Sequence, residues 1–329
     1  MSHEYSAILS GFGSHLPEKR LTNDDLSRMV DTNDEWIVQR TGIRERRIAG
    51  ADESTASLAT GAARKAIASA GIEPGQIELI VCATVTPEMV FPSTACFIGA
   101  ALGLAGVAAF DLAAACSGFV YALVTGANFV KAGQYKSVLV IGAETLSRIT
   151  DYTDRSSCIL FGDGAGAVVL QRSTEAGRGL IYSSLHADGN GAEAMKCMPG
   201  SRHPIGQELL DGKKQFMQIK GREVYKFAVT KFEELIRQAM CACGLSPEQV
   251  KLIVPHQVNR RIIDSALEKL DMSPDKAYVN IDRYGNTSAA SIPIALDDAH
   301  KAGLLQPGDA VILVAFGGGL TWANAVVRI

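Results

Sequence analysis

The sequence predicts an α/β fold built from two similar halves. Short apolar segments rich in Val, Ile and Leu alternate with helical segments along the 329 residues, and buried strands have this composition. The 32 glycines and the frequent alanines suit tight strand-to-helix turns and close packing. The same series of apolar segments recurs in the second half, which favours a duplicated unit over chance similarity of short hydrophobic stretches.

The expected strands follow in order along each half. The first half, placed at residues 1–174, is expected to form strands at 77–84, 108–112, 137–142 and 165–171. The second half, placed at residues 175–329, is expected to form strands at 251–254, 277–281, 310–314 and 323–329. Each strand of the second list corresponds to one of the first. Loops at the carboxyl ends of corresponding strands can then meet at one pocket.

A cysteine stands where the first half would place a nucleophile. Cys116 follows the expected strand at 108–112 and opens an apolar helical segment. The N–H groups and the dipole at a helix N-terminus favour an anion, so we expect the thiolate form of Cys116. A buried Cys that only fills space beside alanines is the alternative.

Two further fragments can supply partners for this thiol. His256 ends the expected strand at 251–254, and Asn286 follows the one at 277–281. His256 could take a proton or donate an N–H to a developing oxyanion, whereas an ordinary core histidine is the alternative. Asn286 could be a plain helix cap, and a cap position is compatible with a catalytic donor. Cys, His and Asn together indicate nucleophilic acyl chemistry.

Composition argues against several classes of function. The net charge of −3 does not suggest a dominant nucleic-acid or membrane partner. The seven cysteines, an odd number lying mostly in apolar stretches, predict reduced thiols in a cytoplasmic protein. Cys241 and Cys243 are too close for a zinc motif. The first residues, Met1 to Tyr5, do not resemble a signal peptide, and segment 95–110 is too short and glycine-rich for a membrane span.

Other motifs leave their alternatives open. The glycines at 317–319 could aim a backbone N–H at a ligand or form a tight turn. The glycine-rich segment 161–166 precedes a strand, so it is a poor dinucleotide fingerprint. Polar residues 188–214 could form a surface excursion over the pocket. The sequence also contains a cluster of basic residues, which could be a solvated helix face or a docking site for an acidic partner. The cluster consists of Lys213, Lys214, Lys220, Arg222, Lys226, Lys231 and Arg237.

Taken together, the longer motifs resemble β-ketoacyl-acyl-carrier-protein synthase III, a family of thiolase-like condensing enzymes. The similarity covers nearly the whole chain. The motifs are segments 34–37, 40–47, 91–93, 113–119, 154–155, 161–166, 221–226, 256–261, 285–291 and 316–322.

The resemblance implies a thiolase-like, duplicated five-layered α/β/α/β/α fold and a homodimer. It implies a catalytic triad of Cys116, His256 and Asn286, with the N–H groups of Cys116 and Gly318 as an oxyanion hole. Phe91 would reach into the acyl pocket of the partner subunit. The substrate-binding residues implied are Trp36, Arg40, Thr41, Arg155, Phe91, Gly221, Phe316, Gly318 and Asn259. The carrier-protein contact implied is Lys226, Gln257, Val258, Asn259, Arg260 and Arg261, where Val258 replaces the family's usual Ala.

The function expected from this resemblance is a decarboxylative Claisen condensation. An acyl-CoA primer would acylate Cys116, and malonyl-acyl carrier protein would then extend it to a β-ketoacyl-acyl carrier protein at the start of fatty acid synthesis. No metal or redox cofactor is expected, because coenzyme A enters as part of a substrate. The alternatives are a related condensing enzyme that makes a polyketide or quinolone precursor, a cysteine hydrolase of the papain type, and a catalytically idle carrier-binding scaffold.

Overall fold

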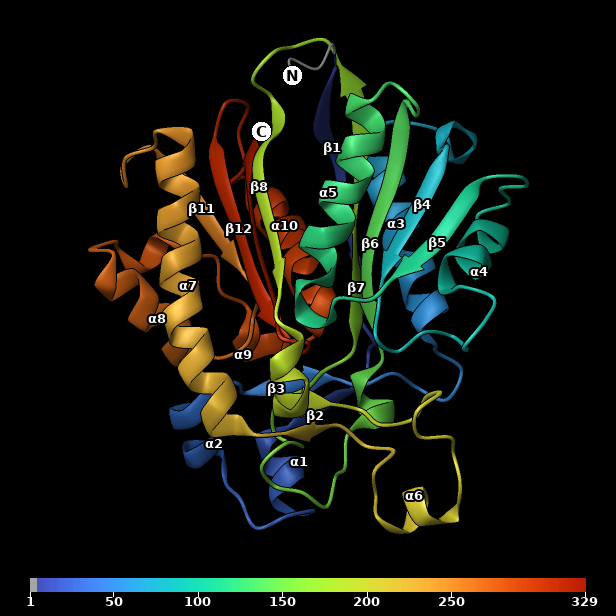
Figure 1. Ribbon diagram of the computed structural model, residues 1–329, viewed down its shortest axis with the longest axis vertical. Coiled ribbons are helices and arrows are strands. Elements are labelled where there is room, and N and C mark those ends of the chain that lie inside the picture. Colours follow the sequence, from blue (N-terminus) through green and yellow to red (C-terminus); the bar gives the residue numbers. More distant parts are fainter. Residues whose placement is uncertain (1–4) are drawn as a thin grey trace.

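The computed structural model describes residues 5–329, and two β-sheets form its centre (Figure 1). The first sheet has five strands in the order β1-β7-β6-β4-β5, and the second has four in the order β11-β12-β13-β8. The strands of the first sheet are β1 (Ser6–His15), β4 (Leu79–Ala83), β5 (Ala108–Leu112), β6 (Ser137–Glu144) and β7 (Gly164–Ser173). Those of the second are β8 (Gly179–Ala187), β11 (Val250–Pro255), β12 (Ala310–Gly317) and β13 (Thr321–Arg328).

Helices on both sides of each sheet make five layers, α/β/α/β/α (Figure 1). The middle layer is α5 (Gly118–Lys131) and α10 (Ser291–Lys301), which contact strands of both sheets. The outer layers are α3 (Thr55–Ser69) with α4 (Thr94–Ala101), and α7 (Gly221–Cys243) with α8 (Arg260–Lys269). The smaller elements are β2 (Arg20–Thr22), α1 (Asn23–Ser27), α2 (Asp34–Thr41), β3 (Glu45–Arg47), β9 (Met195–Lys196), α6 (Gln207–Asp211), β10 (Gln218–Ile219) and α9 (Ile281–Tyr284). The α/β class and the layered architecture are thus confirmed.

The two sheets repeat one another strand by strand. β4 runs parallel to β6, and β7 and β1 follow antiparallel; in the second sheet β11 runs parallel to β12, and β13 and β8 follow antiparallel. The second sheet has no strand that corresponds to β5, because residues 277–281 do not form the strand expected there. Ala277 makes an isolated parallel bridge to Ile253, and α9 already begins at Ile281. The expected strand is therefore reduced to one bridge at the sheet edge.

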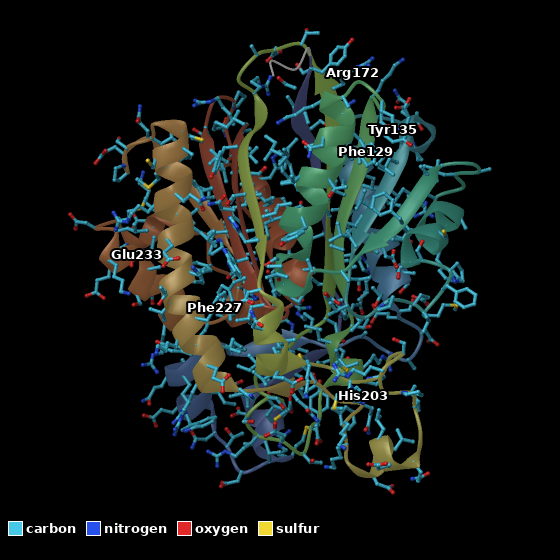
Figure 2. All side chains as sticks on the ribbon, in the orientation of Figure 1. Phe129, Tyr135, Arg172, His203, Phe227 and Glu233 are labelled. Carbon is cyan, nitrogen blue, oxygen red and sulfur yellow. The ribbon has the colours of Figure 1, made fainter. Side chains whose placement is uncertain are left out.

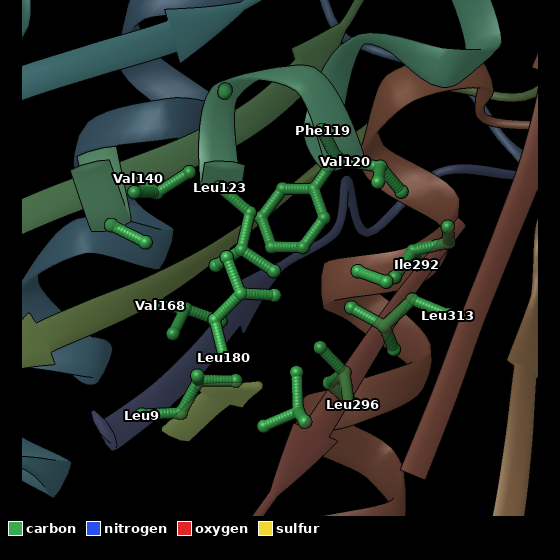
Figure 3. Packing of buried hydrophobic residues seen from close by; sticks show 14 of the residues in the cluster. Leu9, Phe119, Val120, Leu123, Val140, Val168, Leu180, Ile292, Leu296 and Leu313 are labelled. Atoms are coloured by element: carbon green, nitrogen blue, oxygen red, sulfur yellow. The ribbon is translucent and has the colours of Figure 1, made fainter. Parts of the chain in front are cut away.

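One hydrophobic core joins the two halves. Figure 3 shows Leu9 of β1 and Val168 of β7 on one side of Phe119, and Ile292 of α10 and Leu313 of β12 on the other. All five side chains are 8% exposed or less. The chain passes from the first sheet to the second between β7 and β8, close to residue 174. The division into units 1–174 and 175–329 stays a prediction, because this core does not separate them.

Two expectations concern membranes and export. Within residues 5–329, no helix is both long and apolar enough to cross a bilayer. The prediction that the N-terminus is not a signal peptide rests mainly on residues 1–4, which lie outside the described part of the chain. The polar stretch 188–214 contains β9 and α6, and it carries α6 to the lower end of the molecule in Figure 1.

Candidate active site

The candidate nucleophile lies in a strained turn between β5 and α5. Cys116 is the middle residue of the 3-10 turn η2 (Ala115–Ser117), and 6% of it is exposed. Ala115 has a positive φ of 45°, a conformation that costs free energy for a residue other than glycine and that often marks functional turns. The tight turn therefore holds the thiol two residues before Gly118, the first residue of α5.

The expectation of a resting thiolate at Cys116 is wrong. Burial raises the pKa of this thiol to about 12, and the nearby Glu144 carboxylate acts in the same direction. The helix N-terminus favours the anion, but removing the sulfur from water costs more. The thiol of the unliganded site is therefore protonated at neutral pH, and it must lose its proton as it attacks.

His256 follows β11 and is completely buried. Its Nδ1 lies 2.8 Å from the Ser291 Oγ, and the Ser291 hydroxyl donates to the Ser288 carbonyl at 2.8 Å. Because that hydroxyl has only one proton, the Nδ1 must be the donor, so Nε2 is left unprotonated and without a partner among residues 5–329. Burial lowers the pKa of His256 to about 3, so the ring is neutral.

Asn286 lies between α9 and α10 with 5% of its surface exposed. Its backbone is tied to the neighbouring segment, since its N–H donates to Leu160 and its carbonyl accepts from Gly162. Its Oδ1 accepts the N–H of Ser288 at 2.9 Å. The side-chain oxygen is therefore occupied, and the amide NH₂ is the group left to donate to a ligand.

The end of β12 brings the cysteine and histidine segments together. The Phe316 ring packs edge-on against the His256 ring at 5.8 Å. A Cβ added to Gly317 would lie 2.5 Å from the Cys116 nitrogen, so only glycine fits there. Phe227, labelled on α7 in Figure 2, packs against Phe316 from the outer side. Aromatic packing thus holds the histidine, and a glycine lets the strand approach the nucleophile.

A cavity of about 300 Å³ leads from the surface to Asn286. Its outer wall includes Trp36 and Arg40, and its lining is mostly apolar. Of the sequence-predicted residues, it contains Trp36, Arg40, Thr41, Gly221, Val258, Asn259, Arg261 and Asn286. A largely apolar cavity that reaches a buried amide donor suits a flexible chain that carries a reactive group.

At the outer end of this cavity, two guanidinium groups lie over the Trp36 ring. The guanidinium carbon of Arg40 is 4.5 Å from the ring centroid, and that of Arg155 is 4.7 Å. Both distances allow cation–π attraction, so three of the predicted substrate-binding residues form one cluster. Thr41 lines the cavity, but its hydroxyl is occupied, because it donates to Ile37 and accepts from Ile43.

Some predicted site residues lie elsewhere. Phe91 is 81% exposed on the loop between β4 and α4, away from the cavity. Gln257 is 1% exposed, and its side chain bonds to Pro255, Tyr278 and Asn280 inside the protein. The structure therefore removes Gln257 from the predicted carrier-protein contact: its amide completes the buried backbone beside β11 and cannot reach a partner. Gly318 lies beside Ala115, and its oxyanion role stays a prediction.

Several residues of the basic cluster, and one residue of the predicted carrier-protein contact, form ion pairs within the protein. Lys213, Lys220, Lys231 and Arg237 pair with nearby carboxylates, and Arg260 pairs with Asp264 at 2.7 Å. Most of these pairs are helix neighbours three or four positions apart, as on a solvated helix face. Lys226 and Arg261 are exposed, and the ion pairs of residues 5–329 include neither of them.

Sequence reasoning missed three polar groups of the site. Ser291 orients the His256 ring, and the Ser288 hydroxyl is buried without a partner in the described chain. Glu144, at the end of β6, is fully buried near Cys116. The serines look like ordinary helix-start residues, and one acid after a strand carries no signal of its own. The parallel order of β5, β4 and β6 is the signal that places Glu144 on the same sheet edge as the turn that holds Cys116.

Comparison with known proteins places the chain among condensing enzymes. Residues 110–189 match the family model "3-Oxoacyl-[acyl-carrier-protein (ACP)] synthase III", and residues 240–329 match the model of its C-terminal part. The chain is 49% identical over 330 residues to the β-ketoacyl-[acyl-carrier-protein] synthase III of Caldanaerobacter subterraneus subsp. tengcongensis. That alignment covers 100% of this chain and 99% of the relative.

Solved structures agree. The crystal structure of 3-oxoacyl-[acyl-carrier-protein] synthase III from Aquifex aeolicus VF5 superposes with a TM-score of 0.91 at 46% identity, over 98% of this chain and 100% of that one. The priming β-ketosynthase of the R1128 polyketide biosynthetic pathway superposes with a TM-score of 0.92 at 31% identity, over 100% and 98%. The chain therefore belongs to the β-ketoacyl-[acyl-carrier-protein] synthase III family.

Proposed function

We propose that this acyltransferase condenses an acyl-CoA primer with malonyl-acyl carrier protein and so initiates fatty acid synthesis. The observation that carries the proposal is the buried Cys116 turn that β12 brings beside His256, with Asn286 at the end of a cavity that Trp36 and Arg40 line at its outer end. Family membership at 49% identity over the full chain supports it. Cytoplasmic localisation and a homodimer are part of the proposal.

The first half-reaction is acylation of Cys116. The acyl-CoA nucleotide would lie against Trp36, Arg40 and Arg155, with its pantetheine arm in the cavity. The sulfur attacks the thioester carbon, and coenzyme A leaves as the thiol. Backbone N–H groups of Cys116 and Gly318 would stabilise the oxyanion. The proton of the thiol must pass to a base, because burial raises its pKa to about 12.

The second half-reaction is decarboxylation and condensation. The malonyl thioester oxygen would accept hydrogen bonds from Asn286 Nδ2 and His256 Nε2, which stabilise the enolate formed as CO₂ leaves. His256 would act as this donor in its Nε2–H tautomer, in which Nδ1 carries no proton and accepts from the Ser291 hydroxyl once that hydroxyl turns away from the Ser288 carbonyl. With its pKa lowered to about 3, the ring stays neutral and does not protonate the enolate. The enolate carbon then attacks the acyl-Cys116 carbonyl.

Two surfaces would contact other protein molecules, one the carrier protein and the other a second copy of the chain. Lys226 and Arg261, exposed beside the cavity, would meet the acidic carrier protein. Phe91, 81% exposed with Val90 at 97%, would enter the acyl pocket of a second copy of the chain. Large apolar side chains on an exposed loop tip are commonly buried by a partner.

The proposal is tested by following both half-reactions in one sample. Mass spectrometry of the protein after incubation with a panel of acyl-CoAs should show one acyl adduct, on the peptide that contains Cys116. Addition of malonyl-carrier protein should then release CO₂, remove the adduct and give a β-ketoacyl carrier protein. An adduct that is only hydrolysed, or malonyl-carrier protein that has no effect, would contradict the proposal.

Trp36 provides a test of the nucleotide site. Replacing Trp36 with Ala removes the ring that two guanidinium groups flank at 4.5 and 4.7 Å. We expect KM for acyl-CoA to rise about tenfold or more, since stacking and cation–π contacts contribute on the order of 1–2 kcal/mol. An acyl-N-acetylcysteamine, which has no nucleotide, serves as the control substrate, and its kinetics should change less than about twofold. Equal losses for both substrates would place Trp36 outside the nucleotide site.

A polyketide priming function is the second candidate. The R1128 priming β-ketosynthase, 31% identical over the whole chain, shares the fold and favours this alternative. The acyl-CoA panel and the choice of carrier protein decide between the two. The papain-type hydrolase is excluded, because the chain has the thiolase-like condensing fold.

A further inference from the structure

Glu144 is a buried carboxylate close to the nucleophile that the triad does not use. It ends β6, and its side chain is 0% exposed. Its partners are the hydroxyls of Thr84 and Thr86 and the backbone N–H groups of Val85 and Thr86. These bonds meet at Oε2, whereas Oε1 receives only the Val85 N–H at 3.3 Å. One carboxylate oxygen therefore has room for another donor.

The Ser288 hydroxyl is close to both Glu144 and Cys116. The 3-10 turn η6 (Ser288–Ala290) packs against both β6 and η2. The hydroxyl is buried and has no hydrogen-bond partner within residues 5–329, yet it is near enough to lower the pKa of both Cys116 and Glu144. Ser288 also has a positive φ of 48°, a strained conformation for serine. The turn thus holds a hydroxyl that has no partner in the described chain and lies near both a buried thiol and a buried carboxylate.

Acylation needs a base that can take the proton of this thiol. His256 is a poor one, since burial lowers its pKa to about 3. Burial raises the pKa of Glu144 to about 7, far closer to the pKa of about 12 of the thiol. Proton transfer is most efficient toward a base whose pKa lies near the working pH. Of these two groups, Glu144 is the better acceptor.

We propose that Glu144 accepts the Cys116 proton through the Ser288 hydroxyl when the thiol attacks acyl-CoA. The inference rests on the proposed function and assigns the base of its first step. The thiol proton passes to the Ser288 Oγ, whose own proton passes to Glu144 Oε1. The sulfur electron pair forms the bond to the acyl carbon, and the bond from that carbon to the coenzyme A sulfur breaks. The same path then returns one proton to that sulfur, so Glu144 is again a carboxylate.

The pH dependence of acylation follows from the groups that face Glu144. These are Cys116 of η2 and Cys82 of β4, and Asp111 of β5 in turn faces Cys82. Burial holds the pKa of both thiols above the ordinary value, and that of Cys116 at about 12. Both stay protonated near neutral pH, so a change around pH 7 belongs to Glu144. Acylation should accelerate as pH rises through about 7 and then level off, because the carboxylate form is the acceptor.

The experiment measures single-turnover acylation of the full-length protein by acyl-CoA, followed by mass spectrometry at several pH values. Glu144→Gln and Ser288→Ala should each slow acyl-Cys116 formation by about 10²-fold, the usual contribution of a general base. Glu144→Gln should also remove the rise through pH 7. CO₂ release from malonyl-carrier protein, measured on enzyme already acylated by long incubation, should change by less than about threefold.

Asp297→Asn is the matched control, because Asp297 is a buried carboxylate on α10 that pairs with Ser14 and Lys301 instead. It should acylate at the wild-type rate. Wild-type acylation rates in Ser288→Ala, or equal losses in acylation and CO₂ release, would overturn the relay. If Glu144→Gln does not fold, Ser288→Ala and the wild-type pH profile still decide. Absence of any adduct on wild-type Cys116 would refute the proposed function itself, which is a different result.

Discussion

Replacing Cys116 with Ser is expected to lower acyl-enzyme formation by about 10³-fold or more, as removal of a nucleophile does in other covalent enzymes. A hydroxyl is a far weaker acid than a thiol. The burial that raises the thiol pKa to about 12 would oppose an alkoxide still more strongly. The variant should fold, because serine is smaller than cysteine and the site already contains the buried Ser117 and Ser288.

Mass spectrometry of the intact protein after incubation with acyl-CoA measures this loss. Cys243→Ser is the control, since Cys243 is a half-buried thiol at the end of α7, on the outer layer. It should acquire the adduct at the wild-type rate. An adduct that forms equally fast on Cys116→Ser, mapped to another residue, would remove Cys116 from the nucleophilic role.

How far the fold could be predicted depends on how much of each strand is apolar. β4 and β6 are buried at every position and rich in Val, Ile and Leu, so their composition alone indicates strands. The composition of β1 does not predict a strand, because serines and glycines interrupt its apolar residues. Its glycines are required by α3: a Cβ on Gly11 would lie 2.2 Å from the Ala66 oxygen. The glycines of β1 are thus required by the helix that packs across the strand, and the residues of β1 alone do not reveal that helix.

The expected strand at 277–281 shows the opposite error. Its Val, Tyr and Ile residues suit a strand, and Tyr278 does donate one bond to Ile253. Then Asn280 turns away, because its N–H donates to the Gln257 side chain, and α9 begins. The same contact buries Gln257, whose assignment to the carrier-protein surface came from its place in a motif. Both errors arise from one tertiary interaction between segments 23 residues apart.

The motifs predict which residues form the site, but they do not predict the protonation states of those residues. Cys116, His256 and Asn286 occur in distinctive segments, and the structure brings their elements to one place. The N-terminus of α5 favours a thiolate at Cys116. Only the observed burial shows that the cost of removing the charged sulfur from water is larger and keeps the thiol protonated. Similarly, the neutral ring of His256 results from complete burial beside Phe316. Electrostatics of this kind depends on three-dimensional packing.

His256→Ala and Asn286→Ala are expected to slow decarboxylation more than acylation. This is the opposite of the effect expected for Glu144→Gln, which should slow acylation and spare decarboxylation. Each removes one donor for the enolate oxygen, so CO₂ release from malonyl-carrier protein should fall by about 10²–10³-fold. Acylation of Cys116 should fall by less than about tenfold, because a ring with a pKa of about 3 is not its base. The wild-type decarboxylation rate should show no step from His256 titration near neutral pH, since the ring is neutral throughout.

Single-turnover CO₂ release from enzyme carrying an acyl group on Cys116 measures this effect. His186→Ala is the matched control, because His186 stacks on Trp322 at 5.5 Å and lies outside the triad; it should leave both steps within about threefold. The double variant should lose little more than either single one, because two donors that bind one oxygen act as a unit. If His256→Ala instead abolished acylation while Glu144→Gln left it intact, the imidazole would be the base of the first step, and the pKa order of these two buried groups would not govern the reaction.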